Sequence, residues 1–286
     1  MSALKQGCLV TLSVLINMLS TMKDIARDEP VNNATQFDDF FGMMYFEPYA
    51  IEVAKRVDPD TEGIVLEIAA GTGRVTRYIR EKIPASATLI ASDIDGEMLA
   101  VAEKKLAHLN IEWKELDAQE LPFSDNSISL VVCCFGYMFV ANRSKAFAEA
   151  YRVLKPGGRL IFTTWDKLQN NAASYTARTI IEQYLKSPLG AAHNMATSMH
   201  DEGLITKLLS DAQFTTISVE TVRLLSATPT AKAAAHALVS GGSTFKEINP
   251  DDVEEITARV EISLAEKFGT APMAAPMSAL ITQAWK

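Results

Sequence analysis

Apolar and polar residues follow two different periods along this chain. Between residues 63 and 164, short apolar segments alternate with stretches in which apolar residues recur at helical spacing. This order is typical of strand–helix–strand units that form a parallel sheet. We expect strands at 63–68, 88–93, 111–116, 128–135 and 159–164. We expect helices at 74–82, 97–109 and 143–154, the last one ended by a turn at 155–158.

The second half of the chain has a less regular pattern. Helical periodicity is present at 171–185, 201–212, 229–239 and 250–268, and the segment 187–200 reads as a loop because it contains proline and glycine. The alternating segment at 215–225 and the apolar segment at 277–285 predict two further strands. We expect these two strands to pair and to bracket a helical insertion. The whole pattern predicts an α/β protein with a seven-stranded, mostly parallel sheet, helices on both faces and a helical cap.

The chain divides into a short N-terminal part and a long main part. We expect residues 1–50 to be a helical segment of the cap, and residues 51–286 to be the main domain with cap elements near 167–200 and 229–268. Residues 8–19 are largely apolar and follow Lys5, but this segment is too short to span a bilayer. A targeting segment, a cap helix and an over-extended start remain alternatives for residues 1–21.

Composition restricts the function classes. The chain has 286 residues, of which 48% are hydrophobic, so it can fill one sizeable core. Its net charge is −8 and its Lys and Arg residues form no cluster, which disfavours a nucleic-acid binder. Its three Cys and four His residues show no ligand spacing, so we expect no metal. We expect a cytoplasmic protein without firm membrane association, with a small-molecule partner and a homodimer as a candidate assembly.

The strongest local signal is the segment VLEIAAGTGR at residues 65–74. Here an apolar strand runs into a glycine turn and then into a helix. Glycine permits a tight turn and close approach of a ligand to the backbone, and the helix N-terminus offers free N–H donors. Asp93 ends the next strand, where a carboxylate can accept hydrogen bonds from ribose hydroxyls. This combination predicts a nucleoside ligand.

Charge distinguishes two nucleoside cofactors. A nicotinamide dinucleotide site is expected to show G-x-G-x-x-G, but Thr76 stands at the third glycine position. Glu67, within the strand before the turn, would repel a diphosphate. S-adenosylmethionine carries a sulfonium and an amino group and has no phosphate, so the acidic residues Glu67, Asp93 and Asp117 suit it. An NAD-dependent oxidoreductase remains an alternative that these residues disfavour.

Four segments in order resemble the class I S-adenosylmethionine-dependent methyltransferases, in particular the ubiquinone/menaquinone-biosynthesis type, a branch that is methyltransferase type 11-like. They are VLEIAAGTGRVT, IASDIDGEML, LDAQELPFSDNSISLVVCCFGYMF and AYRVLKPGGRLIFTTWD, within residues 45–166. The resemblance implies a Rossmann-like fold and S-adenosylmethionine as the cofactor. The family often has glycine where this chain has Ala69, and the segment FDDFFGMMYFEPYA lacks the pattern expected of the quinone-methylating enzymes.

The resemblance also implies roles for individual residues. It places the methionine part of the cofactor on one loop, with Glu67 ordering that loop: Ala69, Ala70, Gly71, Thr72 and Gly73. It places the ribose, the adenine and its amine on residues after the second and third strands: Asp93, Ile94, Met98, Asp117 and Ala118. It places the reactive sulfur near the end of the fourth strand, beside Phe135 and Gly136. Apart from the resemblance, Tyr45 is a candidate for closing over the cofactor.

The acceptor of the methyl group is predicted from the segments that would cover the carboxyl edge of the sheet. They are rich in aromatic residues and methionines, which favours a small apolar or aromatic acceptor: Phe40, Phe41, Met43, Met44, Tyr45, Phe46, Tyr49, Trp165, Tyr175, Met195 and Met199. His193 and His200 are the candidate general bases, Tyr137 is a second candidate for closing over the cofactor, and Asp166 could orient the acceptor or cap a turn. A non-catalytic S-adenosylmethionine-binding protein remains an alternative.

Overall fold

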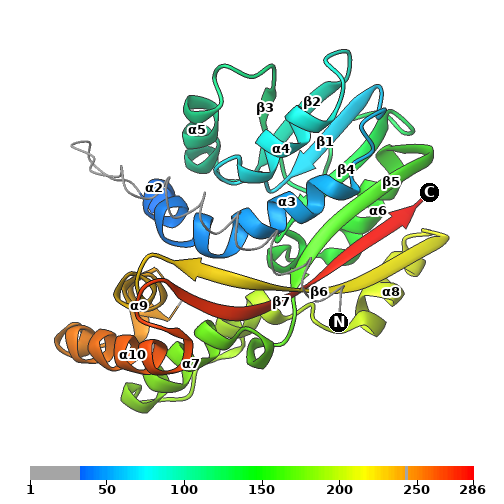
Figure 1. Ribbon diagram of the computed structural model, residues 1–286. Helices are drawn as coiled ribbons and strands as arrows, with labels where there is room; N and C mark the ends of the chain where they lie inside the picture. The colour runs from blue at the N-terminus through cyan, green and yellow to red at the C-terminus, as the bar shows by residue number, and fades with distance from the viewer. Residues whose placement is uncertain (1–32, 242–243) are drawn as a thin grey trace, which may run out of the picture.

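The computed structural model of the protein describes residues 33–241 and 244–286 (Figure 1). Its centre is one seven-stranded sheet with the order β3-β2-β1-β4-β5-β7-β6. The strands are β1 (Ile64–Ile68), β2 (Thr88–Asp93), β3 (Glu112–Glu115), β4 (Ile128–Cys134), β5 (Leu154–Trp165), β6 (Thr216–Thr228) and β7 (Met273–Trp285). Only β7 runs antiparallel to its neighbours. The predicted fold class is confirmed.

Burial explains why the central strands form where they do. β1 (IVLEI) and β4 (ISLVVCC) are rich in β-branched residues and lie between two helical layers, so both faces of these strands are covered. Helix α4 (Arg74–Lys82) connects β1 to β2 and α5 (Gly96–Lys105) connects β2 to β3. Helix α6 (Arg143–Val153) connects β4 to β5, which lie on the other side of β1. Right-handed crossovers in opposite directions place α6 on the opposite face from α4 and α5.

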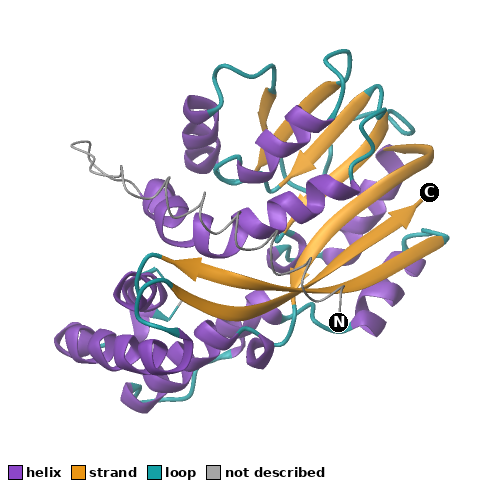
Figure 2. Cartoon of the chain, viewed as in Figure 1, coloured by secondary structure: helices purple, strands orange, loops and turns teal. Residues whose placement is uncertain are grey.

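Two further helices complete the layers. Helix α3 (Glu47–Arg56) packs beside α4, and α8 (Glu202–Asp211) packs beside α6 (Figure 2). Among the helices of these layers, side chains cap α5, α6 and α8: Asp95 caps α5, Asn142 caps α6 and Asp201 caps α8 by accepting backbone N–H groups. Helix α5 ends before the predicted residue 109, because Leu106 leaves the helical conformation.

The strands β6 and β7 pair along their full length and extend past the sheet as a two-stranded ribbon. The cap helices α7 (Ala172–Ile181), α9 (Ala231–Ser240) and α10 (Val253–Phe268) pack against one another and against this ribbon. The predicted pairing and the helical insertion between the two strands are therefore confirmed. The predicted strands at 215–225 and 277–285 were too short, because the ribbon continues beyond the sheet. The turn predicted at 155–158 lies within β5, where Gly157 has a φ of +77°.

Two cap segments differ from a plain loop. The segment 187–200, predicted as a loop, contains the 3₁₀ helix η6 (Ala191–Thr197), and a second one, η7 (Phe245–Glu247), precedes α10.

At the N-terminal side, α2 (Asn33–Phe37) continues into the π-helix η2 (Asp38–Phe46) and then into α3. The predicted boundary at residue 50 falls inside α3, and residues 1–32, with the alternatives left open for them, lie outside the described residues. No helix among the described residues is long and apolar enough to cross a membrane.

Candidate functional site

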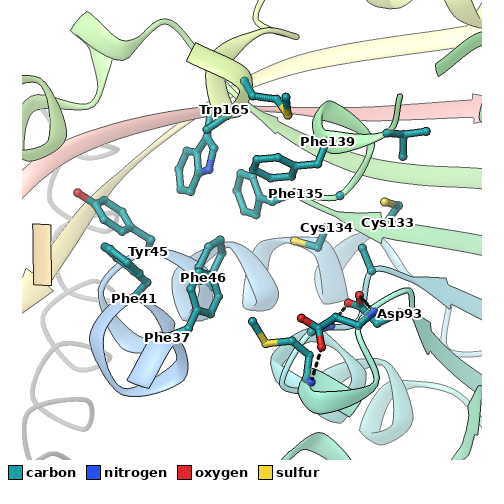
Figure 3. Close-up of a pocket in the computed structure, with 18 of the residues that line it drawn as sticks. Phe37, Phe41, Tyr45, Phe46, Asp93, Cys133, Cys134, Phe135, Phe139 and Trp165 are labelled. Carbon is teal, nitrogen blue, oxygen red and sulfur yellow. Dashed lines mark hydrogen bonds between the residues drawn. The ribbon is translucent and has the colours of Figure 1, made fainter. Parts of the chain in front are cut away.

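A cavity of about 890 Å³ opens at the carboxyl ends of the central strands (Figure 3). Strand-end residues Ile68 of β1, Asp93 of β2, Cys134 of β4 and Trp165 of β5 all line it. The sheet order reverses between β1 and β4, and ligands of open α/β sheets bind at such a switch point. The N-terminal helix η2 and the cap close the other sides, so the cavity lies between the sheet edge and these two segments.

The glycine turn after β1 forms the floor of the cavity. Ala69, Gly71 and Gly73 have φ values of +56°, +54° and +79°, so the backbone turns through the left-handed region at three positions. Ala70, Gly71 and Thr72 also line the cavity. A Cβ at Gly71 would meet nothing within 4 Å, which leaves open space above the loop for a ligand. Gly73 does not line the cavity; a Cβ there would lie 2.9 Å from the Leu106 side chain, so this glycine allows α4 and α5 to approach.

Glu67 lies behind this loop as an isolated buried carboxylate. It is 1% exposed, and neither oxygen has a hydrogen-bond partner among the described residues. Its pKa is raised to about 8, chiefly by burial and to a smaller extent by the charge of Asp93, while the Thr76 hydroxyl acts in the opposite direction. An unpaired buried carboxylate is unfavourable, so this site suits a bound cation that could stabilise its charge. Glu67 does not itself line the cavity.

Asp93 joins the glycine loop to the second strand end. Its Oδ2 accepts the Gly71 N–H at 2.8 Å and its Oδ1 accepts the Asp95 N–H at 3.0 Å. Burial is the main cause that raises the pKa of Asp93, and these backbone donors partly offset it. The Asp93 carboxylate thus orders the loop and, as a residue of the cavity wall, retains lone pairs for a ligand hydroxyl.

The wall after β3 carries a second ordered carboxylate. Asp117 accepts hydrogen bonds from the Gln119 backbone N–H at 2.8 Å and from the Gln119 side-chain amide at 3.0 Å. These hydrogen bonds lower the pKa of Asp117, so it stays ionised. Gln119 lines the cavity beside it and was not predicted as a site residue. Ile94, Met98 and Ala118 line the same side.

The N-terminal wall is held to the glycine loop by a buried carboxylate that the sequence analysis did not identify. Asp38 of η2 accepts hydrogen bonds from Thr72 Oγ1 at 2.5 Å, Arg74 Nε at 2.8 Å and Lys105 Nζ at 2.7 Å. Burial raises the pKa of Asp38, but the cations and hydrogen bonds outweigh it and the net shift is downward. Arg74 also donates to Glu47 at 2.9 Å. The η2 wall is therefore fixed to the loop by ion pairs.

Aromatic side chains form the remaining walls. In Figure 3, Phe37, Phe41, Tyr45 and Phe46 project from the N-terminal helices towards Phe135, Phe139 and Trp165. The rings of Phe135 and Trp165 stack with centroids 4.1 Å apart and an interplanar angle of 19°. Tyr45 approaches Trp165 at 5.6 Å and Phe46 approaches Phe135 at 5.5 Å, both edge-on. This part of the cavity suits a flat apolar molecule.

Phe135 has a special backbone conformation at the end of β4. Its φ of +58° is unusual for a bulky residue, and its N–H is held by the backbone oxygen and the Oγ1 of Thr163, at 3.1 and 3.0 Å. Gly136 follows, and a Cβ there would lie 2.4 Å from the Ala69 Cβ, so the two turns are in close contact. The predicted pair Phe135 and Gly136 thus lies directly beside the glycine loop.

The structure separates the residues that were predicted to act on the acceptor. His193 lines the cavity, whereas His200 does not, and its Nδ1 lies 2.7 Å from the Thr197 carbonyl oxygen. Tyr137 is fully buried against Phe147 in the core, so the prediction that it closes over the cofactor is wrong. Asp166 accepts hydrogen bonds from Lys167 N, Asn170 and Ser278 and does not line the cavity, so it caps a turn instead of orienting an acceptor.

The aromatic and methionine residues predicted for the acceptor divide in the same way. Those that line the cavity are Phe41, Tyr45, Phe46, Trp165 and Met195. Met44, Tyr49 and Met199 belong to the buried core, while Met43 and Tyr175 are absent from the cavity wall. The Phe40 side chain lies outside the described part of the structure. No cluster of potential metal ligands occurs in the described residues.

The sequence and the fold match known proteins over this region. Residues 66–162 match the methyltransferase domain family. Over 114 residues the chain is 37% identical to the ubiquinone/menaquinone biosynthesis C-methyltransferase UbiE of Pseudoalteromonas translucida. The aligned region covers 38% of this chain and 45% of that protein. This region is a class I methyltransferase domain. The predicted resemblance to the UbiE-type branch is confirmed.

Two further comparisons define the extent of the likeness. UbiE of Idiomarina loihiensis is 32% identical over 154 residues, which cover 51% of this chain and 61% of that protein. The chain therefore spans about half the length of the curated relatives it matches. The structure of the YcgJ protein of Bacillus subtilis superposes on this chain with a TM-score of 0.56 and a sequence identity of 17%. The superposition covers 83% of this chain and 97% of that chain. This last likeness shows the fold alone.

The cofactor of class I methyltransferase domains is S-adenosylmethionine, as predicted here from the sequence, and the site fits it. The unpaired carboxylate of Glu67 suits a cationic ligand, and the space above Gly71 admits one close to the backbone. Asp93 and Asp117, at neighbouring strand ends, can accept hydrogen bonds from ribose hydroxyls and an adenine amine. The acidic character of this wall would disfavour a diphosphate.

Proposed function

We propose that this protein transfers a methyl group from S-adenosylmethionine to a small apolar or aromatic molecule. The observation that carries the proposal is the shape of one cavity. Its floor is a glycine loop tied to Asp93, and its opposite walls are aromatic. The floor supports binding of a cationic nucleoside, and the aromatic walls support binding of a flat, poorly hydrated acceptor.

Each side of the cavity would have a distinct part in the reaction. Asp93 and Asp117 would hold the adenosine part, and Gly71 with its neighbours in the loop would receive the methionine part. When bound, the cofactor supplies an electrophilic methyl group on a sulfonium. The aromatic side chains of Phe135 and Trp165 would exclude water and align the acceptor with that methyl group. Positioning of this kind can contribute roughly 7–11 kcal/mol to lowering a barrier.

Titration calorimetry on the purified full chain tests the proposal. S-adenosylmethionine and S-adenosylhomocysteine should bind with micromolar affinity, and NADH should not bind. Binding of NADH alone would refute the proposal and favour an oxidoreductase. Turnover with any small aromatic acceptor, followed as S-adenosylhomocysteine formed, would then distinguish an enzyme from a non-catalytic binding protein. The homodimer and the cytoplasmic location stay predictions.

A further inference from the structure

We propose that Arg178 binds a carboxylate group of the methyl acceptor, so that the acceptor is an aromatic acid. The inference rests on the proposed function and makes it more specific, because it adds one anionic group to the small aromatic molecule and names the residue that recognises it. It concerns the wall that α7 and η6 contribute to the cavity.

The first observation is the face that α7 turns to the cavity. Five residues of this helix and its N-cap line the cavity: Asn171, Ser174, Ala177, Arg178 and Ile181. They recur every three or four positions, so they share one face of the helix. The Arg178 side chain is 13% exposed. Because it is largely shielded from bulk water, an ion pair with a ligand is stronger there than on an open surface.

The second observation is the distribution of charge over the cavity wall. The acidic side chains of the described wall surround the glycine loop and the neighbouring strand ends: Asp38, Asp93, Asp95 and Asp117. The arginines of the described wall are Arg74 and Arg178. Arg74 lies beside the glycine loop, where Asp38 and Glu47 neutralise it at 2.8 and 2.9 Å. The charge pattern therefore favours an anionic group at Arg178.

Arg178 keeps donor capacity for such a group. Its Nε pairs with Glu182 Oε1 at 2.7 Å, but the Glu182 side chain is 50% exposed, so water screens this pair. Its Nη1 and Nη2 make long contacts, 3.3 Å to the His193 carbonyl oxygen and 3.4 Å to Asn194 Oδ1. Each Nη carries two N–H groups, so one on each nitrogen is left for a ligand.

These N–H groups define the anion that fits. A carboxylate accepts two parallel hydrogen bonds from a guanidinium. Asn194 also lines the cavity, and its Nδ2 makes no hydrogen bond within the described residues, so it offers a further donor. The carboxylates of Glu182 and Glu247 lie behind this wall, the second one 3.5 Å from His193 Nε2. Their charges disfavour a phosphate dianion, so a singly charged carboxylate is the better ligand.

The spacing of the wall allows one small molecule to reach both Arg178 and the aromatic side chains. The Tyr45 hydroxyl lies 2.6 Å from Ser174 Oγ, and the Tyr45 ring approaches Trp165 edge-on. Ser174 and Arg178 are separated by about 6 Å along the axis of α7. A ring held against Trp165 can therefore carry a carboxylate that reaches Arg178, while its other substituents are presented to the methyl group.

Calorimetry with matched pairs of ligands tests the inference. The protein is first saturated with S-adenosylhomocysteine, and aromatic acids are then compared with their uncharged amides: benzoate, 2-naphthoate and 4-hydroxycinnamate. At least one acid should bind about 10- to 100-fold more tightly than its amide. If no acid binds better than its amide, the inference is overturned. Tighter binding of 2-naphthyl phosphate than of 2-naphthoate would overturn the assignment to a carboxylate.

Variants of Arg178 identify the residue that causes the preference. Arg178→Gln should remove the preference for the acid and leave the affinity for the amide nearly unchanged. Arg178→Lys should restore part of the preference, because lysine keeps the charge but loses the planar fork. If Arg178 only tied α7 to η6, Arg178→Gln would weaken the binding of acid and amide equally, and that result would refute its binding role. Arg259→Gln, in α10 and outside the cavity wall, is the matched control and should keep the preference.

Binding of S-adenosylhomocysteine by itself separates this inference from the proposed function. All variants should bind it as the wild type does, which also shows that they fold. If the wild type fails to bind it, the proposed function fails and the inference falls with it. If the wild type binds it but does not prefer an acid to its amide, the inference alone is overturned.

Discussion

Cofactor binding should release a proton from Glu67. With a pKa of about 8, this carboxyl group is about 0.9 protonated at pH 7 and about 0.1 protonated at pH 9. A cation bound in the adjacent cavity favours the ionised form and lowers the pKa. Binding at pH 7 should therefore release up to about 0.9 proton from this group, and binding at pH 9 almost none.

The assay is calorimetric titration of S-adenosylhomocysteine at one pH in buffers that differ in ionisation enthalpy. The dependence of the observed heat on that enthalpy gives the number of protons exchanged. The contribution of Glu67 is the difference between the wild type and Glu67→Gln, since protons exchanged by the ligand cancel. Glu62→Gln, an exposed carboxylate before β1, should behave as the wild type does. Equal proton release by the wild type and Glu67→Gln at pH 7 would refute the reasoning.

The same group makes a prediction for the ligand-free protein. Its pKa in the folded state is raised above the ordinary value, so its neutral form is favoured by folding and its ionised form is penalised. The free energy of unfolding should fall by up to about 1.4 kcal/mol per pH unit as the pH rises from ~4.3 to about 8. The free energy of unfolding can be measured by urea denaturation at several pH values across this range. It should fall less steeply with rising pH for Glu67→Gln than for the wild type.

Three further predictions concern the loop. Asp93→Ala should weaken S-adenosylmethionine binding, measured by calorimetry, by about 10- to 100-fold, since hydrogen bonds to charged groups contribute about 1.5–3 kcal/mol. Its circular dichroism spectrum should be unchanged. An unchanged affinity would contradict the binding role of Asp93. Asp38→Asn should lower the free energy of unfolding by about 2–3 kcal/mol at pH 7. This loss is smaller than that expected from breaking a fully buried ion pair, because Lys105 is partly exposed. Since the pKa of Asp38 is lowered, this difference should shrink as the pH falls below about 4. Ala69→Gly should raise the free energy of unfolding by about 0.5–1 kcal/mol by relieving its positive φ, whereas Ala70→Gly should lower it.

The parallel part of the fold was predictable because its signals are local. In β1 and β4 the residues are nearly all apolar, with Glu67 and Ser129 as the exceptions, and the glycine turn follows β1 directly. The apolar pattern and the turn therefore predict the same strand end for β1. The length of β7 was missed because Pro276 interrupts the pattern. The structure tolerates it because β5 pairs only with residues 279–285 of β7, so at Pro276 the strand has a partner on one side alone.

The site was predictable only where its residues follow strand ends. Asp93 and Asp117 lie at fixed distances from the glycine loop along the chain, and the order of parallel strands brings them together. Asp38 and Lys105 meet across 67 residues, and His193 meets Glu247 through the packing of two cap segments. No periodicity encodes such pairs, because they depend on how separate elements pack after each has formed.

The position of β7 has a consequence for the order in which the chain assembles. The strand that comes last in the sequence lies between β5 and β6, which are made earlier. While β7 is absent, β6 has no sheet edge in the native arrangement to join, and α7 and α10 lack one of the surfaces on which they pack. Closure of the sheet and construction of the cap should therefore be a single late event in folding, preceded by formation of the β1–β5 half that carries the glycine loop.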